Sequence, residues 1–300
     1  MNRTTTGPAG LTLSNPGLGC VTFGREIDAA ASFQLMDFAV ARGVTFFDTA
    51  VAYANGASET IIGDWLASRR PAPGGVTVAS KILPPYEPAR IRQEVDKILG
   101  RLRVPALDLL YLHKWDATAE APEALAALDG LVKAGRVRAL GVSNYTSERL
   151  ERALRLQAEA GLARFQYLQN NHNLAVREAD TPYREWCARQ GVAVVTFSPL
   201  GAGFLTGKHR QGVQAGSRFE LIPGHQAIYF QDLSWRRLAR LEAVAARLGR
   251  TSTELALAWA LHQPGIASVL IGGRNSSQLE QALQAQAFND PAVFAELAQD

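Results

Sequence analysis

Cysteine, histidine and excess charge are all scarce in this sequence, and each shortage excludes a class of protein. Its 300 residues include two cysteines, Cys20 and Cys187, too few for a disulfide framework. Both lie in apolar segments, so we expect buried free thiols. The five histidines show no metal-ligand spacing to one another or to the cysteines. We therefore expect no metal site.

The charge balance is nearly even, with 31 Lys and Arg against 28 Asp and Glu, a formal net charge of +3. A nucleic-acid-binding protein normally concentrates its positive charge, whereas here it is spread along the chain. The longest mostly apolar run, residues 192–205, is interrupted by Thr196, Ser198 and Pro199, and the first ten residues are polar. We expect no nucleic-acid partner, no export signal, no membrane span and a cytoplasmic location. No feature of the pattern indicates an oligomeric state.

Apolar residues are abundant, at 47% of the chain, which is ample for a sizeable core. β-Branched apolar runs recur along the sequence, and their interiors, such as LDLLYL and VAVVTF, are almost continuously apolar, as in parallel strands covered on both faces. These runs predict eight strands, at residues 18–22, 44–48, 77–82, 107–113, 137–142, 164–169, 192–197 and 267–271.

Amphipathic segments separate the predicted strands, at residues 29–42, 58–69, 88–103, 122–134, 147–160, 182–190, 234–248 with 253–262, and 277–286. Strict alternation of strand and helix predicts one parallel α/β sheet, and a count of eight fits closure into a single (β/α)8 TIM barrel over residues 1–300. A doubly wound open sheet is the alternative, but Gly17 and Gly19 precede the first strand without the third glycine of a dinucleotide fingerprint. We also expect a short N-terminal hairpin that includes residues 11–14 and plugs the barrel bottom, and a C-terminal helix within residues 288–300.

Titratable side chains gather where the predicted strands end, which is where barrel enzymes carry their chemistry. Asp48 ends the second strand with Tyr53 just beyond it, Lys81 lies in the third, and His113 ends the fourth. Singly, each has an ordinary structural explanation. Jointly they indicate a catalytic site, because a lysine inside an apolar strand needs a charged partner and Asp48 is available.

The paired lysine remains a cation, and a cation beside the Tyr53 hydroxyl is expected to lower its pKa and make it a usable proton donor. His113 can then hydrogen-bond a substrate carbonyl. These residues resemble the aldo-keto reductase family, whose catalytic tetrad is Asp, Tyr, Lys and His in this order, and the resemblance covers nearly the whole chain.

The resemblance also implies a nicotinamide cofactor, NADP(H). GVSN resembles the family's fifth-strand motif, in which Ser143 and Asn144 would hold the carboxamide, and Gln169 matches the sixth-strand glutamine that binds the same amide. TFSPLGAGFLTGK resembles the seventh-strand segment, in which Phe197 would stack on the nicotinamide and the following residues would contact the cofactor. Those following residues are Ser198, Leu200, Gly201, Gly203 and Lys208.

VLIGGRNSSQLEQA resembles the family's pocket for the adenosine 2′-phosphate, here with Gly272, Arg274 and Gln278. Glycine amides at a helix start and a guanidinium suit a phosphate, which favours NADPH over NADH. Ala282 stands where the family often has an adenine-binding asparagine, a departure that bears on the strength of the NADPH preference.

The expected function is NADPH-dependent reduction of an aldehyde or ketone to an alcohol, with the proton from Tyr53 and a small carbonyl compound as the substrate. Phe23, Trp115 and a loop over residues 210–230 are expected to border the mouth, the loop with Phe219, His225 and Tyr229. Aromatic walls do not choose between apolar carbonyls and sugars. Two alternatives stay open: an NAD(P)-dependent sugar or alcohol dehydrogenase, and a cofactor-sensing regulatory subunit with vestigial activity.

Overall fold

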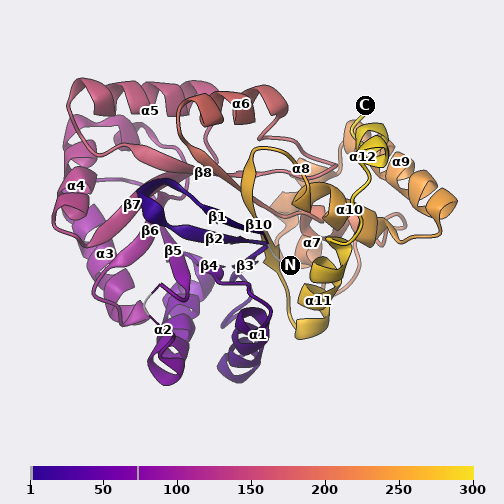
Figure 1. Cartoon of the computed structure of the whole chain (residues 1–300), viewed down its shortest axis with the longest axis horizontal. Coiled ribbons are helices and arrows are strands. Elements are labelled where there is room, and N and C mark those ends of the chain that lie inside the picture. The colour runs from indigo at the N-terminus through magenta and orange to yellow at the C-terminus, as the bar shows by residue number, and fades with distance from the viewer. Residues whose placement is uncertain (1–2, 73) are drawn as a thin grey trace.

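Eight parallel strands close into a barrel in the computed structural model of the chain, which describes residues 3–72 and 74–300 (Figure 1). Met1, Asn2 and Pro73, which the predicted 1–300 domain includes, lie outside the described residues. Each strand pairs in parallel with its neighbour, and β10 pairs with β3 to close the ring. The barrel strands are β3 Gly17–Gly19, β4 Phe46–Asp48, β5 Thr77–Ile82, β6 Leu107–Leu112, β7 Val137–Ser143, β8 Phe165–Asn171, β9 Ala193–Phe197 and β10 Ile266–Gly272. The predicted (β/α)8 barrel is confirmed.

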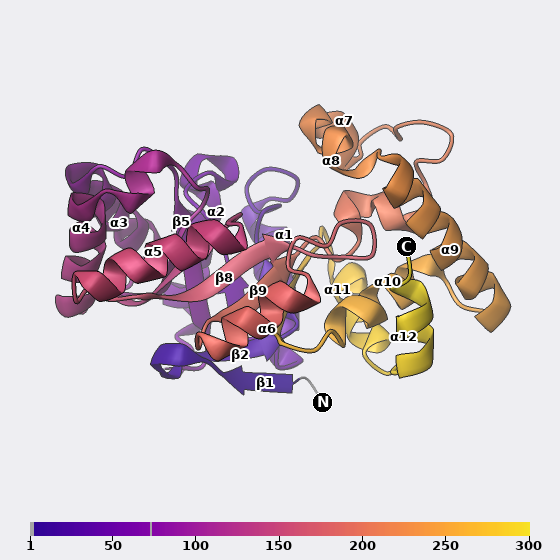
Figure 2. The same cartoon turned by 90° about the horizontal axis from the view of Figure 1, so that it is seen from above.

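Helices surround the ring of strands (Figures 1 and 2). They are α1 Ala29–Ala41, α2 Ala57–Arg69, α3 Pro88–Leu102, α4 Pro122–Lys133, α5 Ser147–Glu159, α6 Thr181–Arg189, α9 Asp232–Leu248, α10 Ser252–Leu261, α11 Ser276–Ala285 and α12 Pro291–Leu297. Several begin at a side chain that accepts a backbone N–H, for example Asp28 before α1 and Thr146 before α5. No helix in the described ranges is long and apolar enough to cross a membrane.

The N-terminal hairpin closes one end of the barrel, as predicted. Strands β1 Arg3–Thr6 and β2 Thr12–Asn15 pair antiparallel, and Ser14 Oγ accepts the N–H of Phe46, the first residue of β4. Leu11 and Leu13 are buried in the same cluster as Phe46 and other residues that fill the barrel. In Figure 2, this hairpin lies on the opposite side of the molecule from the short helices α7 Arg218–Leu221 and α8 Gln226–Tyr229.

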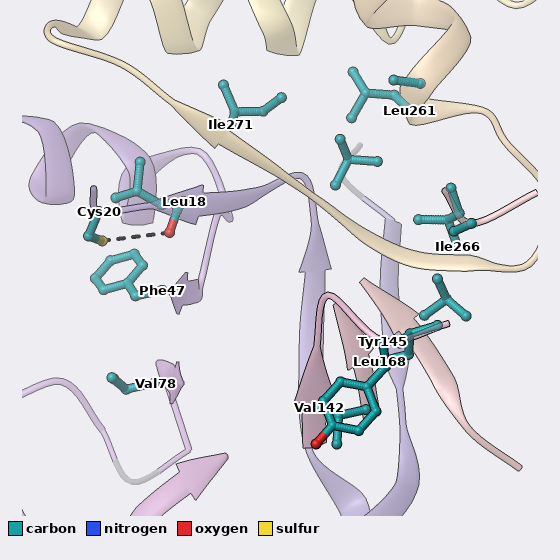
Figure 3. Packing of buried hydrophobic residues seen from close by; sticks show 14 of the residues in the cluster. Leu18, Cys20, Phe47, Val78, Val142, Tyr145, Leu168, Leu261, Ile266 and Ile271 are labelled. Carbon is teal, nitrogen blue, oxygen red and sulfur yellow. Dashed lines mark hydrogen bonds between the residues drawn. The ribbon is translucent and has the colours of Figure 1, made fainter. Parts of the chain in front are cut away.

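A larger apolar cluster fills the layer between strands and helices. Figure 3 shows Leu18, Cys20 and Phe47 of this cluster packed together, with the Cys20 thiol directed at the Leu18 carbonyl. Cys20 and Cys187 are both buried and free, as expected from their apolar surroundings. No group of three or more His, Cys, Asp or Glu side chains in the described part of the chain could hold a metal ion.

The first strand is shorter than expected, and the predicted range 18–22 was wrong at its C-terminal end. Strand β3 stops at Gly19, and the Thr22 carbonyl accepts the N–H groups of Arg25, Glu26 and Ile27 in a tight turn. An apolar run alone does not show where these backbone groups find turn partners instead of ladder partners. The other strand ends differ from prediction by no more than two residues.

Candidate active site

A buried ion pair forms the centre of the barrel mouth. Asp48 ends β4 and Lys81 lies near the end of β5, and both are almost completely buried. Lys81 Nζ donates to Asp48 Oδ2 at 2.5 Å, to the Thr49 carbonyl at 2.8 Å and to the Tyr53 hydroxyl oxygen at 3.3 Å. The three N–H bonds of the ammonium group are therefore all used, and the predicted pairing of Lys81 with Asp48 is present.

Tyr53 begins a tight turn of unusual backbone geometry. Ala54 and Asn55 have φ angles of 48° and 53°, followed by Gly56 at 87°. Left-handed non-glycine residues are uncommon, and they cluster at functional sites where the surrounding structure holds them. Because the Tyr53 oxygen accepts from Lys81, its own proton is left to donate to another group.

The predicted direction of the Tyr53 pKa was wrong for the protein alone. Burial raises the pKa of Tyr53 above its ordinary value, and the Lys81 charge opposes this rise without cancelling it. The nearby cation is visible in the sequence, whereas the loss of hydration on burial is not. For Lys81, burial favours the neutral form, but Asp48 and Tyr53 outweigh it and raise the lysine pKa, so the ammonium form persists.

His113 follows β6 directly and lies across from Tyr53. The two ring centroids are 6.0 Å apart and the rings meet edge to face. Burial, together with the Lys81 and Lys114 charges, lowers the pKa of His113 to about 3. The imidazole is therefore neutral near pH 7, with one N–H donor and one acceptor.

The three residues expected to hold the carboxamide lie together at the ends of β7 and β8. The Gln169 carbonyl accepts from Ser143 Oγ at 2.8 Å and from the Asn144 backbone N–H at 3.0 Å. Asn144 has a φ of 59°, and its side-chain amide donates to the His113 carbonyl at 2.9 Å. This set therefore connects directly to the tetrad.

A glycine-rich turn after β9 fits a bound anion. At Gly203, with a φ of 96°, an added Cβ would lie 3.4 Å from Lys208 Nζ and 3.8 Å from His209 Nε2. His209 is 2% exposed and its Nδ1 accepts from the Gln214 N–H, so Nε2 carries the ring proton, and this buried atom has no partner. An ammonium and an unpaired N–H converging on a glycine turn suit a diphosphate.

The remaining residues of this segment lie around that turn. Phe197 ends β9, and its ring is half-buried at the barrel interior. Ser198 has a φ of 57°, and Leu200 accepts the Gly203 N–H through its carbonyl, while Gly201 donates back to the Ser198 carbonyl. The segment therefore forms a tight backbone turn directly after the Phe197 ring.

The residues predicted to bind the 2′-phosphate lie at the end of β10, in the turn after it and in the first turn of α11. Gly272 ends β10, and Gln278 Oε1 accepts the Arg274 backbone N–H at 2.8 Å. The exposed Arg274 guanidinium donates to the Gly216 carbonyl at 3.0 Å. Ala282 is completely buried, so this position of α11 faces the core.

The expected walls of the mouth need correction. Phe23 is completely buried within the outer apolar cluster, and Phe219 and Tyr229 are buried in an aromatic group with Phe204 and Phe230. These rings hold the 210–230 loop together instead of facing a substrate. Trp115 remains half-buried, with the Arg149 guanidinium 4.0 Å from its ring centroid.

Several features of this site were not predicted from the sequence. They include the Thr49 carbonyl as a Lys81 partner, the unpaired N–H of His209, and an ion pair of Arg218 with Glu26 at 3.0 Å that ties the 210–230 loop to the turn after β3. Of these features, only His209 had a signal in the sequence, namely its position next to Lys208. Backbone acceptors and ion pairs between distant loops leave no pattern in the sequence.

Proteins of similar sequence match this chain over nearly its whole length. A model of the Aldo/keto reductase family matches residues 17–297. The chain is 30% identical to "Uncharacterized oxidoreductase YrpG" of Bacillus subtilis (strain 168), over 95% of this chain and 91% of that protein. It is 30% identical to "Protein tas" of Escherichia coli (strain K12), over 91% and 90%. A "Probable voltage-gated potassium channel subunit beta" of Arabidopsis thaliana is 27% identical over 93% and 89%.

Proposed function

Since the chain belongs to the aldo/keto reductase family, we propose that it reduces an aldehyde or ketone to an alcohol with NADPH, and that Tyr53 supplies the proton. Family membership makes the protein an oxidoreductase that uses a nicotinamide cofactor. The choice of NADPH, the proton donor and the cytoplasmic location are parts of the proposal.

One observation carries the proposal: Lys81, held by Asp48, donates to the Tyr53 oxygen at 3.3 Å. This contact leaves the phenol proton directed elsewhere and stabilises the phenolate that forms when the proton leaves. The neutral His113 ring, edge-on to Tyr53, supplies a second donor to the same carbonyl oxygen. Two donors to a developing oxyanion make up an electrostatic site of the kind whose single donors are typically worth ~10²–10³ in rate.

The bound cofactor would supply the hydride to the carbonyl carbon. Ser143, Asn144 and Gln169 would hold its carboxamide and Phe197 its nicotinamide face. The turn that carries Gly203 and Lys208 would hold the diphosphate, and Arg274 with Gln278 the 2′-phosphate. His209 Nε2, buried and unpaired beside Gly203, is the structural reason to place an anion there.

A second candidate is a cofactor-sensing regulatory subunit, which is favoured by one observation. Two plant relatives that match 93% of the chain carry the name of a probable channel subunit beta. A complete tetrad is compatible with slow turnover in such a subunit, so the two candidates differ in rate. An NAD(P)-dependent dehydrogenase uses the same residues in reverse and is distinguished by its cofactor preference.

The test is NADPH oxidation with aromatic aldehydes, short aldehydes, ketones and sugars, beside Tyr53→Phe and repeated with NADH. We expect turnover of at least one carbonyl class with NADPH, reduced by ~10²-fold or more in the variant, and unchanged NADPH binding measured by tryptophan fluorescence. Equal turnover in Tyr53→Phe would refute the proton-donor role. Tight NADPH binding without turnover would favour the regulatory candidate.

A further inference from the structure

Gln169 makes a contact that reaches across the barrel. Its side chain is 2% exposed, and Nε2 donates to Asp48 Oδ1 at 2.7 Å. Strands β4 and β8, which carry the two residues, are four places apart in the eight-stranded ring, so they are opposite each other and share no ladder hydrogen bonds. This contact therefore joins the two halves of the barrel at the level of the ion pair.

The chemistry of Asp48 determines which end of the Gln169 amide faces it. Lys81 donates to Oδ2 at 2.5 Å, and an ionised carboxylate only accepts, so Oδ1 needs a donor. The NH₂ end of Gln169 is that donor. The two carboxylate oxygens are thus fixed by partners from different strands, Lys81 on β5 and Gln169 on β8.

The backbone of Gln169 is tied as firmly as its side chain. Its carbonyl accepts from Ser143 Oγ and from the Asn144 N–H, and Asn144 in turn donates to the His113 carbonyl. A single residue therefore connects the Asp48–Lys81 pair, the end of β7 and the chain at His113. A glutamine that only contacted the cofactor would not need the bond to Asp48.

We propose that Gln169 is a positioning residue for the proton donor: its amide holds Asp48 from across the barrel, so that the Lys81 ammonium stays between Asp48 and the Tyr53 hydroxyl. This inference rests on the proposed function for its catalytic consequence, but its structural content concerns residues of this chain alone. Without the amide, Asp48 Oδ1 becomes a buried acceptor without a partner. Its charge is then less neutralised and draws Lys81 away from Tyr53.

The other titratable side chains near Asp48 and Lys81 come from several elements. They are Cys20 after β3, Tyr111 within β6 and His113 after it, and burial opposes ionisation of all three. The readout must therefore report Tyr53 specifically.

The experiment compares Gln169→Met with the wild-type protein by ¹³Cζ-tyrosine NMR, without cofactor or substrate. The Tyr53 signal is assigned by its absence in Tyr53→Phe. We expect the Tyr53 resonance to move and its titration to shift upward by about one pH unit. With NADPH and the best carbonyl at saturating concentrations, kcat should fall about tenfold, in addition to the rise in the Kd for NADPH that follows from loss of the carboxamide contact.

Two further variants sharpen the result. Gln169→Glu keeps the shape, and once its carboxyl group is ionised it only accepts and adds a second negative charge beside Asp48. At the high pH where Tyr53 titrates it should therefore shift that titration in the same direction, even if Gln169→Met folds poorly. Ser143→Ala, a neighbour in the carboxamide set, should weaken NADPH binding and leave the Tyr53 resonance in place. Unchanged Tyr53 signals in both Gln169 variants, with only the NADPH Kd altered, would overturn the inference. Absence of turnover in the wild type refutes the proposed function but leaves the NMR comparison valid.

Discussion

Lys81 shows how a buried charge is made tolerable by complete pairing. An isolated buried ammonium would lose its proton, but here each N–H bond has an acceptor and one of these is a carboxylate. The same arrangement that keeps Lys81 charged directs it at Tyr53. The structural role of Lys81 and its proposed catalytic role therefore coincide in one side chain.

Replacing Lys81 with methionine should damage both stability and activity. Asp48 would remain as a buried carboxylate without its cation, which should lower the free energy of unfolding by about 3–5 kcal/mol. Urea unfolding should show this loss, and carbonyl reduction should fall to near background. In the double variant Asp48→Asn, Lys81→Met, stability should partly recover while reduction stays low. Recovery of both would contradict the assigned role of the pair.

Arg274 is expected to decide between NADPH and NADH. Its guanidinium is exposed, and among the residues that the structure describes it donates one N–H to the Gly216 carbonyl, so it retains donors for a phosphate. Arg274→Ala should raise the Kd for NADPH by roughly 10- to 100-fold, the worth of a charge-assisted hydrogen bond. The Kd for NADH should change less than about twofold. Arg236→Ala, an exposed arginine on α9, serves as the control, and equal losses for both cofactors would count against 2′-phosphate binding.

Helix α2 packs so closely against the end of α3 that it has no room for a side chain at Gly63. An added Cβ there would lie 2.0 Å from the Arg101 carbonyl oxygen, and backbone cannot move aside as a flexible side chain can. The same contact region contains the buried Glu59, which accepts from Ser80 and Arg101. The spacing of these two helices is therefore set by glycine and by one buried carboxylate.

Two matched glycine substitutions test this packing. Gly63→Ala should destabilise the protein by about 1–3 kcal/mol or more, because overpacking forces the helices apart. Gly130→Ala in α4, where nothing lies within 4 Å of the added Cβ, should instead stabilise by roughly 0.5–1 kcal/mol. Denaturant midpoints of the two variants should move in opposite directions, and a shift of both to higher stability would rule out the close approach.

Buried neutral histidines make the whole molecule sensitive to acid. Burial, with nearby positive charges, lowers the pKa of His113 and of His172 to about 3, against about 6.5 in an unfolded chain. Between these values the unfolded state binds more protons, so the free energy of unfolding decreases as pH falls from about 6.5 toward 3. The contribution of these two histidines to the free energy of unfolding is fully present above about pH 6.5.

The expected slope is up to about 1.4 kcal/mol per pH unit for each histidine. Urea unfolding at pH 7.5, 6.0 and 5.0 should show the midpoint falling, and His172→Gln should show a shallower decline than the wild type. A pH-independent midpoint over this interval would mean that these histidines take up protons in the folded protein over the same pH range as in the unfolded chain.

The sequence by itself determined the barrel and which titratable side chains meet at its mouth. Eight apolar runs alternating with amphipathic segments allow few folds other than a closed parallel sheet, and strand ends converge at one rim, so Asp48, Lys81 and His113 were bound to meet. The N-terminal hairpin was also predictable from its position before the first strand.

Only the tertiary structure decided what those residues contact. Phe23, Phe219 and Tyr229 are aromatic in the sequence whether they face a substrate or the core, and packing placed them in the core. The net Tyr53 pKa depends on burial, which has no local signature. The Gln169–Asp48 bond joins two residues on opposite strands that are 121 positions apart in the sequence, a proximity that arises only when the barrel closes.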